Sequence, residues 1–146
     1  MENIYFAKIN NNAIIPSKRN EDGAYDIYAC IDENYIILQP GEIKMIPTGL
    51  ISAFDPKYRI VFQERGSTGI KGLKVNAGLI DSGYRGEWVV ILNNVSNKEI
   101  TYPTNKAICQ AKVQFVPKIN IVETTPDEIN SFVSERGTGK LGSSGK

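Results

Sequence analysis

Turn-forming residues divide this chain into many short β-prone stretches, and that division limits the folds open to it. Three consecutive asparagines at 10–12, Pro40 with Gly41, and Asp55 with Pro56 mark such breaks. Short strands at this regular spacing favour a sandwich or barrel of mostly antiparallel sheet. We therefore expect an all-β fold with strands over 4–9, 25–29, 35–38, 43–48, 58–63, 88–92 and 109–115.

The apolar pattern within two expected strands predicts how each of them is covered. Residues 88–92 are apolar on both parities, which indicates a strand covered on both faces. In 109–115 apolar and polar residues alternate, which predicts one buried and one solvated face. The apolar set is Cys109, Ala111, Val113 and Phe115, and the polar set is Gln110, Lys112 and Gln114.

The C-terminal part of the chain departs from the β pattern. Thr125 is a suitable N-cap, Pro126 suits the first helical position and Glu128 completes a capping box, so a short helix over 126–133 is expected. The glycines and serines after this point leave nothing to pack. We expect one domain over 1–135, followed by a mobile tail over 136–146.

Residue counts exclude several classes of function. The chain has no histidine, which excludes Ser-His-Asp and Cys-His triads and leaves Asp, Glu, Lys or Tyr as the base of any enzyme. With 17 basic and 16 acidic residues, the net charge gives no indication of nucleic acid or anionic membrane as a partner. There is no apolar run of spanning length and no secretory signal, and the two cysteines fit reduced thiols. We therefore expect a cytoplasmic protein.

Two glycine-rich stretches carry residues suited to chemistry. In 64–69, Arg65 beside small residues offers a guanidinium and exposed backbone N–H groups to phosphate oxygens, although a solvated turn is the alternative. In 76–86, Gly78 permits the close approach of a planar ligand. Asp81 is a candidate general base on water and Tyr84 a candidate platform beneath a sugar, the alternative being a β-hairpin loop.

A third such stretch forms the end of the chain. Arg136 and Lys140 are spaced among glycines, an arrangement that resembles a flexible phosphate clamp. A linker is the alternative interpretation of a Gly/Ser-rich tail. It is not a Walker loop, because the Gly-Lys-Ser/Thr ending and the following helix are missing.

Taken in order, these stretches resemble the five motifs of the trimeric dUTP pyrophosphatase (dUTPase) family. Residues 23–29 read G-A-Y-D-I-Y-A, similar to A-G-Y-D-L-x-A, and 65–69 read R-G-S-T-G. Residues 78–86 read G-L-I-D-S-G-Y-R-G, close to G-x-I-D-x-x-Y-x-G. Residues 105–110 read N-K-A-I-C-Q, similar to G-D-R-I-A-Q, and the tail from Arg136 is the fifth motif. Their shared order and spacing is far more specific than any one motif.

The resemblance implies both an architecture and a reaction. The architecture is a jelly-roll-like β-barrel that forms a homotrimer, with sites at subunit boundaries and the tail of one subunit closing over the site of another. The reaction is hydrolysis of dUTP to dUMP and pyrophosphate with Mg²⁺, which keeps uracil out of DNA and supplies dUMP for thymidylate synthesis. Magnesium and basic groups carry much of the charge stabilisation in such a reaction, so the lack of histidine is no objection.

The resemblance also implies roles for individual residues. Asp81 is implied as the base that deprotonates the attacking water, Tyr84 as the residue that excludes a ribose 2′-hydroxyl, and Asp26 as a contact to magnesium through water. The implied substrate-binding residues are Arg65, Gly66 and Ser67 at the triphosphate, Gly78, Leu79 and Ile80 around the uracil, Gln110 near the α-phosphate or the water, Asn76, and Arg136, Leu141, Gly142 and Ser143 in the tail.

Two positions depart from the family pattern. Gly66 stands where the second motif normally has serine. Leu141 stands where the family places a phenylalanine that stacks on uracil, which loses an aromatic face worth roughly 0.5–1.5 kcal/mol. Trp88 is a candidate replacement, but we expect it to pack in the core of its strand.

Two other functions on the same fold stay open at this point. A dCTP deaminase-like enzyme is one, although the short chain and the glycine-rich tail argue against it. A nucleotide-dependent regulatory or binding protein is the other, and it is kept open by Gly66 and Leu141. A purely structural β-sandwich leaves Asp81 and Tyr84 in their glycine setting unexplained.

Overall fold

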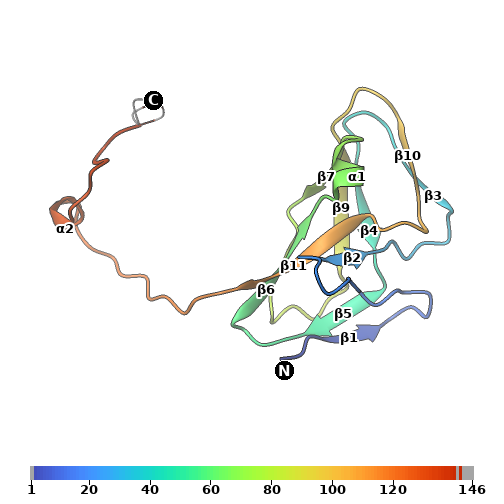
Figure 1. Cartoon of the computed structure of the whole chain (residues 1–146), viewed down its shortest axis with the longest axis horizontal. Coiled ribbons are helices and arrows are strands. Elements are labelled where there is room, and N and C mark those ends of the chain that lie inside the picture. Colours follow the sequence, from blue (N-terminus) through green and yellow to red (C-terminus); the bar gives the residue numbers. More distant parts are fainter. Residues whose placement is uncertain (1, 141, 143–146) are drawn as a thin grey trace.

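The computed structural model describes residues 2–140 and 142, and its architecture is predominantly β (Figure 1). Strands predominate and the two described helices are short, so the expected all-β class is confirmed. The elements are β1 (Tyr5–Lys8), β2 (Tyr25–Ile27), β3 (Tyr35–Leu38), β4 (Ile43–Pro47), β5 (Leu50–Ala53), β6 (Tyr58–Gln63), α1 (Gly66–Gly69), β7 (Leu73–Asn76), β8 (Leu79–Ile80), β9 (Val89–Asn94), β10 (Ile100–Pro103), β11 (Cys109–Phe115) and α2 (Pro126–Ser131).

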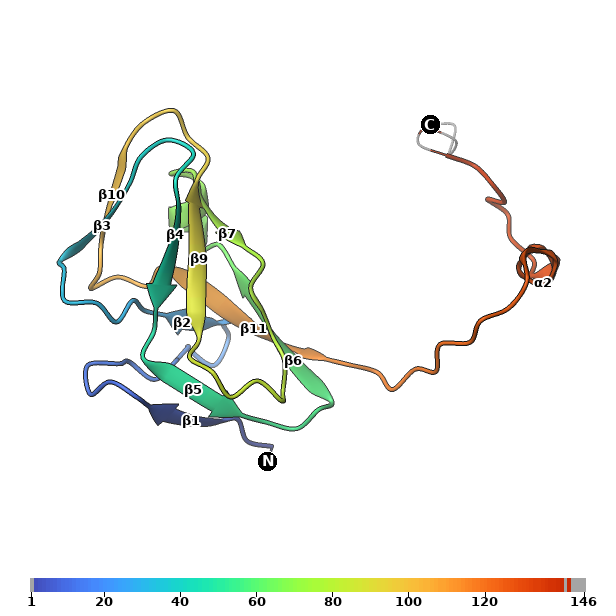
Figure 2. The same cartoon turned by 180° about the vertical axis from the view of Figure 1, so that it is seen from behind.

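The strands form small antiparallel sheets around one core. The sheets have the orders β1-β5, β10-β3, β2-β11-β6-β8 and β4-β9-β7, and Figures 1 and 2 show them arranged around the same interior. Trp88 is 1% exposed, and its ring meets Phe6 and Phe62 edge-on at centroid distances of 4.9 and 5.5 Å. The indole N–H donates to Ser52 Oγ at 2.9 Å. The expectation that Trp88 packs in the core is confirmed.

Two expected burial patterns are only half right. The outer face of β9 is half-exposed, because β9 lies between β4 and β7 with a single face on the core. In β11, Cys109 and Ala111 are buried as expected, but Val113 and Phe115 are 38% and 65% exposed. The strand continues past the core to the point where the chain leaves the sheets, so its last apolar residues lack a covering layer.

Both helical segments differ in detail from the sequence expectation. Residues 66–69 form one helical turn, α1, where no helix was expected, and the Thr68 hydroxyl both donates to Arg65 O and accepts from Arg65 N at 3.0 Å. In α2, Thr125 Oγ1 accepts from Glu128 N at 3.2 Å, as expected for the N-cap. The Glu128 carboxylate is bonded by the Thr124 hydroxyl, so no capping box forms, and α2 ends at Ser131 instead of 133.

Beyond β11 the chain leaves the sheets as an extended segment. Val116 N donates to Lys57 O at 2.6 Å, and the segment then leads away through α2 (Figures 1 and 2). Its apolar side chains are exposed, including Ile121 and Val122. No helix among residues 2–140 and 142 is long and apolar enough to cross a membrane.

Candidate active site

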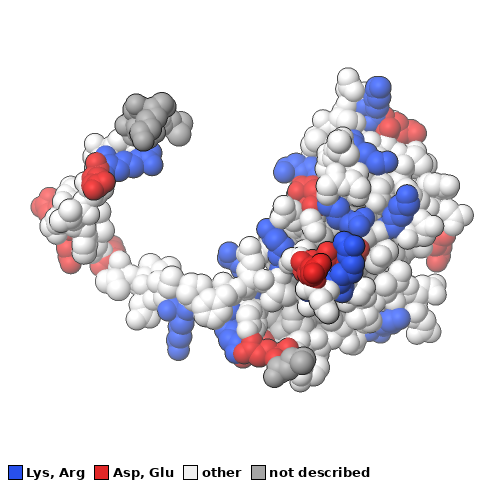
Figure 3. Space-filling view, viewed as in Figure 1, with Lys and Arg blue, Asp and Glu red and all other residues white. Residues whose placement is uncertain are grey.

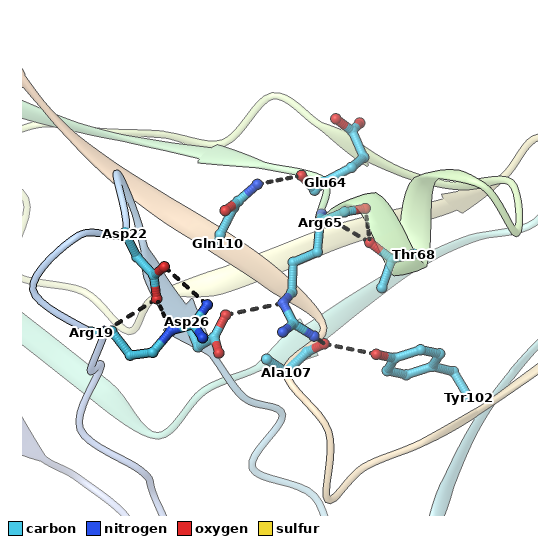
Figure 4. A network of polar contacts seen from close by, with 9 residues as sticks. All are labelled: Arg19, Asp22, Asp26, Glu64, Arg65, Thr68, Tyr102, Ala107 and Gln110. Atoms are coloured by element: carbon cyan, nitrogen blue, oxygen red, sulfur yellow. Dashed lines mark hydrogen bonds and ion pairs between the residues drawn. The ribbon is translucent and has the colours of Figure 1, made fainter.

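The end of β6 opens onto a cavity of about 710 Å³. One wall is the segment from Ser17 to Asp26 and the other is the start of α1 (Figure 4). The structure thus brings together a guanidinium, two small residues, a carboxylate and an amide from three separate motifs. The residues of the implied site that line this cavity are Asp26, Arg65, Gly66, Ser67 and Gln110.

Arg65 is held in this cavity by a side chain of β2 and by a carbonyl of the loop between β10 and β11. Its Nε lies 3.0 Å from Asp26 Oδ1, an ion pair in which both side chains are about one-third exposed. Its Nη1 donates to Ala107 O at 3.5 Å. The Tyr102 hydroxyl donates to the same carbonyl oxygen. Asp26 lies on β2, directly opposite Gln110 on β11. The guanidinium is therefore oriented before any ligand arrives.

Gln110 and Glu64 fix the join between β11, β6 and β7. Gln110 Nε2 donates to Glu64 O at 2.8 Å, which leaves the amide oxygen of Gln110 as an acceptor toward the cavity. The Glu64 carboxylate accepts from Val75 N at 2.8 Å and lies 3.7 Å from Lys74 Nζ. Burial opposes its charge, but the backbone N–H groups of Val75 and of Glu64 itself, together with Lys74, outweigh burial and lower the pKa of Glu64. Glu64 is thus a structural carboxylate of this join.

The segment 76–80 is shaped by packing between strands. Asn76 ends β7, and the chain then crosses through Ala77 and Gly78, both with positive φ, to pair with a different sheet as β8. A Cβ on Gly78 would lie 3.0 Å from Phe62 Cβ, and Phe62 N donates to Gly78 O at 2.8 Å. The close approach that requires glycine here is to the protein's own strand β6.

Asp81 and Tyr84 lie on a well-anchored exposed loop between β8 and β9. Tyr84 N donates to Asp81 O at 3.1 Å, and the Tyr84 hydroxyl donates to Glu87 O at 3.1 Å. Arg85 Nη1 donates to Ser82 O at 2.7 Å and to Ser52 O on β5 at 3.3 Å. Asp81 is exposed, and 46% of Tyr84 is exposed. This loop presents a carboxylate and a phenol ring to solvent.

Within one chain, this loop and the cavity lie apart. The pairing of Ile80 with Ile60 in the antiparallel β8-β6 ladder places Asp81 beside Arg59. Arg65 is six residues further along the same chain, roughly 20 Å away at about 3.3 Å per extended residue. No residue of 76–84 lines the cavity. A single chain therefore does not bring Asp81 and Arg65 to one phosphate group.

The tail residues of the implied site lie away from both the cavity and the loop between β8 and β9. Arg136 is exposed, and its Nε donates to Gly139 O at 2.9 Å within the tail itself. Gly142 is exposed, while Leu141 and Ser143 lie outside the described residues. In Figures 1 and 2 the chain beyond α2 lies apart from β6 and the other labelled strands.

The cavity also contains residues that the sequence analysis missed. Lys18, Arg19 and Asp22 line it together with Arg65. The available signal was the consecutive basic pair Lys18 and Arg19, a few residues before the first motif. This pair of residues does not by itself predict a place in the cavity. The cavity forms only when β11 pairs with β2 and β6, which lie far from it in the sequence.

Comparison with known proteins shows several chains that are similar to this one. The dUTPase family model matches residues 10–145. The deoxyuridine 5'-triphosphate nucleotidohydrolase of Nautilia profundicola is 35% identical over 143 residues, covering 95% of this chain and 96% of that protein. The protein of the same description from Clostridioides difficile is 33% identical, covering 99% of each.

Solved structures share the fold. The dUTPase of Staphylococcus bacteriophage 80alpha with dUPNHPP has a TM-score of 0.78 at 21% identity and covers 100% of both chains. The native EIAV dUTPase has a TM-score of 0.71 at 22% identity, covering 85% of this chain and 98% of that one. The dUTPase of phage phi11 of S. aureus, described with a structural Mg(II) ion, has a TM-score of 0.71 at 18% identity, with coverage of 85% and 99%.

Proposed function

The chain belongs to the dUTPase family, and we infer from that membership that it hydrolyses dUTP to dUMP and pyrophosphate. The cavity that Arg65, Asp26 and Gln110 line together is the observation that links this function to particular residues. Asp81 and Tyr84 complete the proposed machinery from their exposed loop. The chain contributes both parts, but they meet only when copies of it assemble.

We propose a homotrimer with the jelly-roll-like barrel of the family and with sites at its subunit boundaries. The separation of Asp81 from Arg65 supports this, because one chain alone leaves the site divided. The outer face of the β4-β9-β7 sheet also supports it, since Met45 is 69% exposed beside the half-exposed Ile91. On the same face, the buried Asn93 Oδ1 has no hydrogen-bond partner among the described residues. A second copy on this face would cover the apolar residues.

In the proposed reaction, Asp81 orients a water molecule and accepts its proton. The water oxygen forms a bond to the α-phosphorus, the bond from that phosphorus to its bridging oxygen breaks, and pyrophosphate leaves. Arg65 neutralises charge on the phosphates with the guanidinium edge that Asp26 and Ala107 leave open. The Tyr84 ring packs against the deoxyribose, and the backbone from Gly78 to Ile80 reads the uracil edge.

Mg²⁺ suits the donors of this cavity. Magnesium binds hard oxygen ligands, keeps several waters, and commonly uses one or two carboxylates together with substrate phosphates. Asp26 supplies such a carboxylate beside Arg65, and we propose that it contacts the ion through water. The described residues contain no group of three or more His, Cys, Asp or Glu able to hold a metal by themselves. When bound, Mg²⁺ would neutralise negative charge on the phosphates.

We propose that the tail closes over a site of a neighbouring copy. In this account residues 1–135 form the domain and 136–146 the mobile closing segment, with Arg136, Gly142 and Ser143 at the γ-phosphate end and Leu141 against the uracil. Ordering the glycines costs conformational entropy, and the closed tail excludes water from the reaction. We also propose that the protein acts in the cytoplasm, where it keeps uracil out of DNA and supplies dUMP for thymidylate synthesis.

A nucleotide panel tests the proposed function. With Mg²⁺, the chain is expected to convert dUTP to dUMP and pyrophosphate, with little action on dTTP, dCTP or UTP. The physical reason is that the Tyr84 ring excludes a 2′-hydroxyl and the backbone of 78–80 fits uracil. Chromatographic separation of the products measures the outcome. Ammonia released from dCTP would indicate a deaminase instead, and nucleotide binding without any turnover would indicate a regulatory protein.

A further inference from the structure

We propose that Lys18 and Arg19 form a second cationic wall of the phosphate cavity and bind the pyrophosphate portion of the substrate. The inference rests on the proposed function and extends it to residues outside the five motifs. Both side chains line the same cavity of about 710 Å³ as Arg65 and Gln110. In Figure 4 the Arg19–Asp22 pair lies across Asp26 from Arg65.

The segment that carries these two cations is closed on itself by backbone hydrogen bonds. Asp26 N donates to Ser17 O at 2.9 Å, so the segment begins and ends at the base of the cavity. Asp22 N donates to Arg19 O at 3.1 Å and closes a turn inside it. Since Asp26 also pairs with Arg65, the two walls of the cavity are connected through one side chain.

Arg19 is oriented by a two-point ion pair. Its Nε and Nη2 lie 3.0 and 3.1 Å from the two carboxylate oxygens of Asp22, and its backbone N–H donates to the same carboxylate at 3.2 Å. The side chains are 88% and 37% exposed, and exposed pairs contribute little to stability. The consequence of the pair is orientation, because it occupies one edge of the guanidinium and leaves the Nη1 donors for a ligand. No hydrogen bond from Nη1 is formed within the described part of the chain.

Lys18 is held on the same segment by different groups. Its Nζ lies 3.2 Å from Arg19 O and 3.4 Å from Asn20 O, and 5.4 Å from the centre of the Tyr25 ring. Carbonyls and an aromatic face attract an ammonium group without neutralising it. Lys18 is therefore held at the cavity wall by neutral groups.

The charges around the cavity favour a strongly anionic ligand. The lining residues include Lys18, Arg19 and Arg65 against Asp22 and Asp26, an excess of one positive charge before any Mg²⁺ is bound. Figure 3 shows basic and acidic side chains gathered on this face over the β2 region. A triphosphate or pyrophosphate gains more from a second cationic wall than a monophosphate does, because it carries more charge over a longer span.

The test is a double variant, Lys18→Met with Arg19→Gln, compared with Lys98→Met with Lys71→Gln, a control that removes the same charge at two exposed positions outside the cavity. We expect the double variant to raise KM for dUTP about tenfold while kcat changes less than about twofold. Inhibition by pyrophosphate should weaken about tenfold, and inhibition by dUMP should stay unchanged.

The outcomes separate this inference from the proposed function. Unchanged KM and unchanged pyrophosphate inhibition in active protein would overturn the inference and leave dUTP hydrolysis standing. An equal loss of dUMP affinity would also overturn it, because dUMP lacks the pyrophosphate portion. Calorimetric titration of the assembled protein with pyrophosphate and Mg²⁺ needs no turnover. If wild-type protein fails to hydrolyse dUTP, weaker pyrophosphate binding by the double variant still supports the inference, and equal binding contradicts it.

Discussion

Replacing Asp81 with asparagine is expected to lower kcat for dUTP by roughly 10²–10⁴-fold, the range that a positioned general base contributes. Asparagine keeps the size of the side chain but cannot accept the proton of the attacking water. The loop itself should persist, because its hydrogen bonds use Asp81 O, the Tyr84 hydroxyl and the Arg85 guanidinium rather than the Asp81 carboxylate. The measurement is steady-state pyrophosphate release together with calorimetric binding of a non-hydrolysable dUTP analogue, which should remain within about threefold of the parent.

Asp55→Asn is the matched control for this variant. Asp55 is exposed in the turn before β6, where its Oδ1 accepts from Lys57 N at 2.9 Å, a bond that an asparagine oxygen can also accept. We expect this variant to retain parental turnover. Parental turnover in Asp81→Asn would show that the base is a different residue.

Deleting residues 136–146 is expected to lower kcat/KM for dUTP by about 10²-fold, because positioning and water exclusion depend on closure of the tail. The described tail makes no hydrogen bond or ion pair to the strands, so the fold should not depend on it. We expect the circular dichroism spectrum and the thermal unfolding midpoint to stay unchanged while the kinetic constants fall.

The control for the deletion is a chain of the same length in which 136–146 is replaced by alternating glycine and serine. This chain keeps the flexibility of the tail but removes Arg136 and Lys140. It should be as impaired as the deletion. If either chain shows parental kinetics, the tail is a linker and takes no part in the site.

The sequence predicted only those strands whose own residues form an apolar run or an alternating apolar pattern. The bounds of β3 and β6 match the expectation, because both are apolar runs of the right length between turn residues. The strands β5, β7, β8 and β10 were missed. β5 and β7 begin beside Gly49 and Gly72, which indicate turns, and they become strands through pairing with β1 and β9 far away in the sequence.

The motifs include residues that the structure brings to one cavity, but they do not predict how the other parts of the implied site meet. Asp26, Arg65 and Gln110 come from three motifs, and the structure places them on one cavity. The separation of Asp81 from Arg65 was not predictable, because it depends on the register of β8 against β6. The missed wall of Lys18 and Arg19 has the same cause, since β2 joins β11 over more than eighty residues of sequence.

Mixing two inactive variants tests the divided site most directly. Asp81→Asn chains keep Arg65 and Arg65→Ala chains keep Asp81, so each parent assembly lacks one part of every site. Unfolding the two together and refolding them allows mixed assemblies to form, while each variant refolded alone is the control. The account predicts that the mixture regains dUTP hydrolysis well above the sum of its parents, because some sites then combine an intact Asp81 with an intact Arg65 from another copy. No recovery, in mixed assemblies confirmed by mass spectrometry, would place both residues of each site in a single chain and contradict the account.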